Sequence, residues 1–151
     1  MAGKIDFQDY VAISEVKARY CRCMDTKDWT GFADLFTEDF ELDTSAAGGP
    51  AMIRGRDAAV NAIRAWVGSA QTTHQVHSPE MQINGDVAQV VWAMQDRVIW
   101  SAERRPQPEM GGHTGYGHYH ERYARKDGRW RIAAQRLTRL IVDFHPPRPA
   151  T

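Results

Sequence analysis

Asp25 and His74 are the residues of this sequence that point most clearly to a chemistry. Asp25 stands where one apolar-patterned stretch ends, just before a second stretch begins at Asp28. His74 follows two threonines and opens an apolar-rich segment typical of a strand. If the fold brings the two side chains together, the carboxylate can orient the imidazole and stabilise its charged form. The pair would then be a general base that needs no metal and no cofactor.

Two predicted helices place Asp25. An amphipathic helix is expected over about residues 8–26, because apolar side chains recur there at helical spacing. Asp28 is a good N-cap for a short second helix. This second helix is expected to carry Trp29, Phe32, Leu35 and Phe36.

The rest of the chain is expected to form strands around one more helix. Residues 40–43 alternate like a short strand, and residues 58–67 supply the apolar face of a third helix. Long strands are predicted at 72–83, 87–101, 113–126 and 129–143, with hairpin turns at 84–86 and 126–128.

This order predicts an α+β fold: a cone-shaped barrel in which N-terminal helices pack into a strongly curved, mixed, mostly antiparallel sheet. We expect one domain over residues 1–151, with a core at about 8–145. The proline-rich tail at 145–151 cannot continue a central strand.

Alternation along the strands predicts which side chains line the interior of the cone. Tyr119 shares a face with Gly115, Gly117 and Glu121, and Trp92 and Met94 share a face with Val90 and Asp96. Alternation from Trp130 through Ile132 and Ala134 also places Arg136 inward. A buried guanidinium needs a partner or an anionic ligand.

Charge and composition limit the classes of partner. Lys plus Arg equals Asp plus Glu, so the formal net charge is zero, which argues against nucleic acid or an anionic membrane surface. No apolar signal region follows the first residues, and no apolar run is long enough to span a bilayer. Cys21 and Cys23 lie two apart on a predicted helix and are expected to stay reduced, as in a cytoplasmic protein.

The histidines do not predict a metal site. His74 and His77 would face opposite sides of a strand, and His118 and His120 share a face without a third ligand. No glycine-rich phosphate loop or Gly-x-Ser-x-Gly elbow occurs either, so we expect neither a nucleotide cofactor nor serine hydrolysis.

Three motifs, in this order and spacing, resemble a known family. They are Asp25-Thr26-Lys27-Asp28-Trp29, Thr72-Thr73-His74, and Tyr123-x-x-x-Asp127-Gly128-x-Trp130. The sequence is similar to the scytalone dehydratase and SnoaL-like group of the nuclear-transport-factor-2-like superfamily over about residues 8–145. The resemblance implies a cone-shaped α+β barrel that holds a small molecule. Members include cofactor-free dehydratases, a dehydrochlorinase, cyclases, isomerases and retro-aldol lyases.

The resemblance also implies roles for single residues. Asp25 and His74 match the catalytic dyad of scytalone dehydratase and the dehydrochlorinase. Tyr20 matches a tyrosine of bile-acid dehydratases, and Arg136 matches an arginine near the leaving group of the dehydrochlorinase. Met24 and Trp92 depart from scytalone dehydratase, which makes scytalone an unsuitable substrate but leaves the proton-abstraction residues in place.

Together these observations predict a cofactor-independent lyase that removes a proton from an aromatic or cyclic small molecule. The overall reaction would be dehydration, another β-elimination or retro-aldol cleavage. Its catalytic residues would be His74, Asp25, Tyr20 and Arg136, and its substrate-binding residues Tyr119, Trp92, Met94, Met24 and Trp29. An isomerase or cyclase, or a non-catalytic binding or oxygenase-subunit module, remains the alternative. Outward aromatic and histidine side chains at Trp100, Tyr116, His118 and His120 favour a homo-oligomer, by resemblance a trimer over a dimer.

Overall fold

The computed structural model describes residues 6–148, which form three α-helices and six strands. Their bounds are α1 Phe7–Thr26, α2 Trp29–Ala33, β1 Phe36–Asp43, β2 Ile53–Arg54, α3 Arg56–Val67, β3 Gln71–Asn84, β4 Val87–Ile99, β5 Gly112–Lys126 and β6 Arg129–His145. Short 3₁₀ turns lie at Ser45–Ala47 and Ala102–Arg104.

Helix α1 carries the site residues at its C-terminal end. The Asp6 side chain caps its first turn by accepting a hydrogen bond from the Gln8 amide, and Lys27 ends the helix in the left-handed conformation, with φ 61°. Its buried side chains are Ile13, Lys17, Tyr20, Cys21, Cys23 and Met24, most of which recur every three or four residues. One face of α1 therefore points into the sheet.

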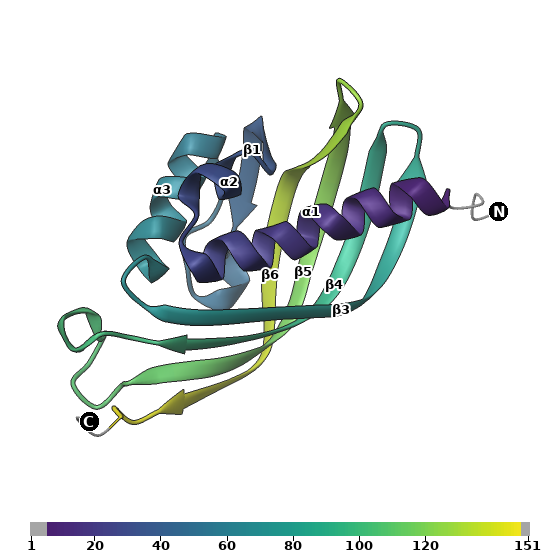
Figure 1. Cartoon of the computed structure of the whole chain (residues 1–151). Helices are drawn as coiled ribbons and strands as arrows, with labels where there is room; N and C mark the ends of the chain where they lie inside the picture. Colours follow the sequence, from purple (N-terminus) through teal and green to yellow (C-terminus); the bar gives the residue numbers. More distant parts are fainter. Residues whose placement is uncertain (1–5, 149–151) are drawn as a thin grey trace.

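The strands form one sheet in the order β2-β1-β6-β5-β4-β3. Strands β3 to β6 pair antiparallel in sequence, and β1 joins β6 in parallel. The sheet bends around α1, which crosses it, while α2 and α3 stand beside β1 (Figure 1). The predicted α+β cone with a mixed, mostly antiparallel sheet is confirmed.

Strand β6 contains two irregularities that decide which side chains face inward. Its register with β5 shifts between the pairs Tyr123–Ile132 and Arg122–Ala134, which leaves Ala133 without a partner. It shifts again between Gly117–Arg139 and Tyr116–Ile141, which leaves Leu140 unpaired. Each extra residue moves the side chains that follow it to the opposite face of the sheet.

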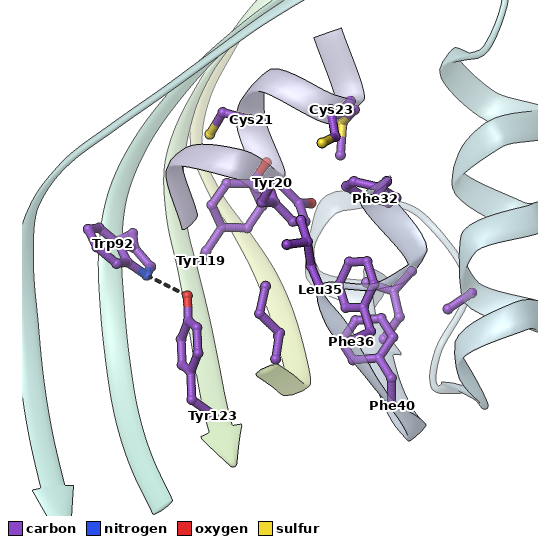
Figure 2. Close-up of a cluster of buried hydrophobic side chains, with 14 of the residues drawn as sticks. Tyr20, Cys21, Cys23, Phe32, Leu35, Phe36, Phe40, Trp92, Tyr119 and Tyr123 are labelled. Carbon is purple, nitrogen blue, oxygen red and sulfur yellow. Dashed lines mark hydrogen bonds between the residues drawn. The ribbon is translucent and has the colours of Figure 1, made fainter. Parts of the chain in front are cut away.

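An aromatic cluster fills the space between the helices and the sheet (Figure 2). The ring centres of Phe32 and Phe36 lie 5.0 Å apart, and those of Phe36 and Phe40 lie 4.3 Å apart. The predicted second helix was too long, because α2 ends at Ala33 and Phe36 already pairs with Ile132 in the sheet. The inward ring of Phe36 thus belongs to β1.

The start of the predicted tail lies against the loop before β5. The Gly111 amide donates a hydrogen bond of 2.8 Å to the His145 carbonyl. Residues 149–151 of that tail are outside the described range. Among the described residues, no helix has both the length and the apolar character needed to cross a bilayer.

Candidate active site

Asp25, in the last turn of α1, and His74, on β3, are in direct contact. Asp25 Oδ1 lies 2.7 Å from His74 Nδ1, and Asp25 Oδ2 accepts a 2.8 Å hydrogen bond from the His74 backbone amide. The Thr72 hydroxyl donates to Oδ1 at 2.9 Å. Because a carboxylate accepts hydrogen bonds, we assign the ring proton to Nδ1, which leaves the Nε2 lone pair of the neutral imidazole unprotonated.

A lysine extends this hydrogen-bond network to the end of the helix. Lys27 Nζ donates to the Thr72 hydroxyl at 2.9 Å, so Thr72 links the ammonium to the Asp25 carboxylate. Burial lowers the pKa of Lys27, and the nearby Asp25 charge partly opposes that effect. The side chain of Lys27 thus connects the end of α1 to β3.

The other ring nitrogen of His74 faces a second carboxylate. His74 Nε2 lies 4.0 Å from Asp96 Oδ2, and both side chains are 5% exposed. Arg139 binds Asp96 with two parallel hydrogen bonds of 2.7 and 2.8 Å, and His113 Nε2 lies 3.7 Å from the same Oδ2. Burial alone would raise the pKa of Asp96, but the approach of His113 and the hydrogen bonds and charge of Arg139 outweigh it. They hold that pKa well below its ordinary value.

Gly115 makes room for this ion pair. It lies on the inward face of β5, opposite Asp96 in the β4–β5 register. A Cβ atom at this position would clash with the Arg139 guanidinium and with Asp96 Oδ1. A glycine on the inward face was visible in the sequence, but the arginine that needs the space was not.

A second ion pair forms the floor of the cone. Lys17 Nζ lies 2.6 Å from Glu121 Oε1, and both side chains are completely buried. The ammonium also lies 3.7 Å from the ring centres of Tyr20 and Tyr119, close enough for cation–π contact with both. Glu121 accepts two further hydrogen bonds, from Gln135 at 2.6 Å and from Tyr123 at 2.5 Å.

The interior tyrosines stay protonated. Burial raises the pKa of Tyr20, Tyr119 and Tyr123 well above the ordinary value, and the negative charge of Glu121 adds to this effect for Tyr20 and Tyr123. The Tyr20 hydroxyl donates to Gln135 at 3.2 Å, so its proton is already engaged. Tyr20 can hold the floor in place, but in this arrangement it does not face His74 as a free donor.

Four of the five predicted binding residues are buried in the interior, and the fifth, Trp29, is not. Tyr119, Trp92, Met94 and Met24 are all buried, and the Trp92 indole donates to the Tyr123 hydroxyl at 3.2 Å (Figure 2). Trp29 is half-buried and packs edge-on against Phe32. It also lines a hollow of about 440 Å³ at the end of α3, together with Arg64 and Arg104.

The inward position predicted for Arg136 is wrong. Its side chain is 59% exposed and lies 4.0 Å from Asp43 on the outer face of the sheet. The unpaired Ala133 reverses the alternation after Ile132, so Gln135 takes the inward position. The guanidinium inside the site belongs to Arg139 instead.

Sequence reasoning missed several residues of this interior as functional candidates: Lys17, Asp96, His113, Gln135 and Arg139. Asp96 and Glu121 had been placed on inward faces, and an acidic residue there is a sign of a buried partner. The sequence pointed to Lys17 less clearly than to Asp96 and Glu121. Its one sign was a lysine at the helical spacing of the apolar side chains of α1. Within residues 6–148, no three His, Cys, Asp or Glu side chains are grouped to hold a metal ion.

Comparisons with known proteins identify the family and the fold. Residues 6–136 match the SnoaL-like domain family. A probable cyclase, FGR4, from Gibberella zeae is 26% identical over 137 residues, which cover 85% of this chain and 89% of that protein.

Solved structures show the same fold. A variant of Rv3472, a protein of unknown function from Mycobacterium tuberculosis, is 29% identical with a TM-score of 0.74, covering 89% of this chain and 73% of that one. A type 2 hexachlorocyclohexane dehydrochlorinase, LinA, is 13% identical with a TM-score of 0.78, covering 95% and 96% of the two chains. At that identity, the likeness to LinA shows the fold alone.

Proposed function

The chain belongs to the SnoaL-like domain family, and we propose that it is an enzyme of the lyase type in which His74 removes a proton from a small aromatic or cyclic substrate. The observation that carries this proposal is the 2.7 Å contact between Asp25 and His74 Nδ1. It leaves Nε2 on the side of the ring that faces Asp96, without a hydrogen bond and free to take a proton. Relatives named as a cyclase and a dehydrochlorinase support enzymatic chemistry in this fold.

The chemistry follows from the three hydrogen bonds on Asp25. They fix the position of the carboxylate, which in turn fixes the imidazole tautomer and stabilises the imidazolium that forms when Nε2 takes a proton. A positioned base of this kind contributes about 10²–10⁴-fold to a rate. When the proton comes from carbon, the carbanion or enolate that remains expels a leaving group from the neighbouring carbon. When it comes from a hydroxyl, the alkoxide becomes a carbonyl, and the carbon–carbon bond breaks with its electron pair on the departing enolate.

The walls of the cone favour a flat, apolar substrate. Trp92, Met94 and Tyr119 lie on the inward face of the sheet, and Met24, buried on α1, belongs to the same core cluster. Aromatic and thioether side chains contact aromatic rings well. This lining is the reason for proposing an aromatic or cyclic compound.

A cyclase is the second candidate, since a relative carries that name. It would use the same proton removal, after which the carbanion attacks within the substrate. A non-catalytic binding module needs no Asp–His contact. The 2.7 Å distance therefore favours an enzyme over that alternative.

The test is a screen of aromatic β-hydroxy carbonyl compounds, followed by the absorbance of the new conjugated product. His74→Ala and Asp25→Asn are expected to lose turnover by at least about 10²-fold, with unchanged circular dichroism. His77→Ala is the matched control, because His77 lies on the same strand with an exposed side chain. Full activity in His74→Ala would remove the dyad from the mechanism.

A further inference from the structure

A single carboxylate oxygen lies between two imidazoles in the site. Asp96 Oδ2 is 4.0 Å from His74 Nε2 and 3.7 Å from His113 Nε2. Both distances are too long for a hydrogen bond, so neither nitrogen is committed to Asp96. Each therefore faces the same carboxylate oxygen and keeps its hydrogen-bonding capacity for another group.

Asp96 cannot itself carry a proton between them. The bidentate contact with Arg139 and the approach of His113 outweigh burial and hold the pKa of Asp96 well below its ordinary value. It therefore stays ionised at neutral pH. A fixed negative charge at this point stabilises an imidazolium on either side.

His113 is placed to exchange protons with the outside. It lies near the start of β5, and its side chain is 15% exposed, against 5% for His74. Its ring lies between Trp100 and Phe144, with ring-centre distances of 5.5 and 6.2 Å.

The charged and titratable groups around His113 come from two neighbouring strands. Asp96 on β4 faces it directly, and Arg139 on β6 binds the same carboxylate. His145, also on β6, lies nearby and its Nε2 is hydrogen-bonded to the Thr114 hydroxyl at 2.9 Å. Asp96 is therefore the carboxylate that His113 meets.

We propose that His113 is a second catalytic residue, which protonates the leaving group, and that Asp96 and Arg139 are positioning residues that hold it opposite His74. This rests on the function proposed above and narrows it to substrates whose leaving group is a hydroxyl. Hydroxide leaves poorly unless it is protonated, whereas a halide leaves without a proton. A site that pairs a base with a proton donor is built for loss of water.

The proposed step balances. His74 Nε2 takes the proton from carbon, and the electron pair of that C–H bond forms the new C=C bond. The C–O bond breaks with its electron pair on oxygen, and His113 gives its Nε2 proton to that oxygen, so that water departs. His74 then holds one proton more and His113 one fewer, and return of that proton to His113 through the departing water restores both.

The first test follows the ring signals of the two histidines by NMR in isotope-labelled protein. Because both rings face the same Asp96 oxygen, we expect Asp96→Asn to move the ring signals of both histidines, and His113→Gln to move those of His74. His74 and His113 signals that are unchanged in Asp96→Asn, or a His74 signal that is unchanged in His113→Gln, would overturn the proposal.

The second test compares β-hydroxypropiophenone with β-chloropropiophenone, which give the same product by loss of water or of chloride. His113→Gln should slow loss of water by about 10²-fold or more and leave loss of chloride within about threefold. His118→Gln, on the outer face of the same strand, is the matched control.

The outcomes separate the two proposals. Equal losses on both ketones, or a wild type that releases only chloride, would contradict the role of His113. Activity on neither ketone would contradict the elimination chemistry of His74, and the NMR comparison would then still decide whether His113 and His74 are linked through Asp96.

Discussion

Replacing Lys17 with methionine tests whether the floor of the cone depends on its ion pair. Lys17 and Glu121 are completely buried, and their charged atoms lie 2.6 Å apart. Methionine keeps much of the length of the lysine side chain but removes the charge. In Lys17→Met the Glu121 carboxylate therefore stays in the interior without its counter-ion.

The expected cost is large because the charge that remains cannot reach water. Removing one partner of a buried ion pair costs about 3–5 kcal/mol. The hydrogen bonds that Glu121 accepts from Gln135 and Tyr123 survive and favour the lower part of that range. For a chain of 151 residues, each kcal/mol lowers Tm by about 2–4 °C, so we expect Tm to fall by about 6–20 °C.

Urea unfolding followed by tryptophan fluorescence measures this cost. The matched control is Arg19→Met, on the same helix. Its pair with Glu15 is 3.8 Å long, with side chains 57% and 64% exposed. An exposed pair of this kind contributes less than about 1 kcal/mol. The difference between the two variants isolates the effect of burial.

A double variant separates the uncompensated charge from lost packing. Adding Glu121→Gln to Lys17→Met removes the second charge and keeps a polar group near Gln135 and Tyr123. Most of the lost stability should return, because neutral replacements of buried ion pairs are often tolerated. A cost below about 1 kcal/mol in the single variant, or a double variant no more stable than the single one, would refute the reasoning.

Two further predictions concern the ion pair near His74. The pKa of Asp96 is lower in the folded state than in the unfolded state. The ionised carboxylate therefore stabilises the fold above about pH 4, and this stabilisation is lost as the pH falls through the pKa of the folded state. The difference in unfolding free energy between wild type and Asp96→Asn should therefore narrow from about pH 5 to about pH 2, and a constant or widening difference in urea titrations would contradict this. Gly115→Ala should lower the free energy of unfolding by about 1–3 kcal/mol, because the new Cβ displaces Arg139. An unchanged Tm in thermal unfolding would show that the space beside Gly115 is free.

Regular periodicity made most of the fold predictable. The helix over about 8–26 and the four long strands correspond to α1 and to β3 through β6, because each contains a long stretch with a regular pattern of inward side chains and the strands are bounded by turn residues. The meeting of Asp25 and His74 was also foreseen, since the motifs around them resemble a known family. In the structure, Asp25 meets the β3 backbone as well as the ring.

The errors arise where the pattern is broken. Alternation along β6 holds only up to Ile132, and the unpaired Ala133 then exchanges the positions expected for Gln135 and Arg136. No residue type in that stretch marks a bulge, which depends on how β5 and β6 pair. Lys17 was missed for another reason, because its partner Glu121 lies 104 positions away in the sequence.

The two ion pairs confine the chemistry to one end of the cone. At the floor, the Glu121 carboxylate is engaged by Lys17, Gln135 and Tyr123, and the surrounding phenols remain protonated. Burial likewise raises the pKa of the Cys21 thiol to about 11, so it is not a nucleophile at neutral pH. Of the interior groups described, His74 is the one with an uncommitted basic nitrogen between two carboxylates. The groups at the floor therefore hold the interior in shape and take no part in proton transfer. Proton transfer belongs at the end where α1 meets β3.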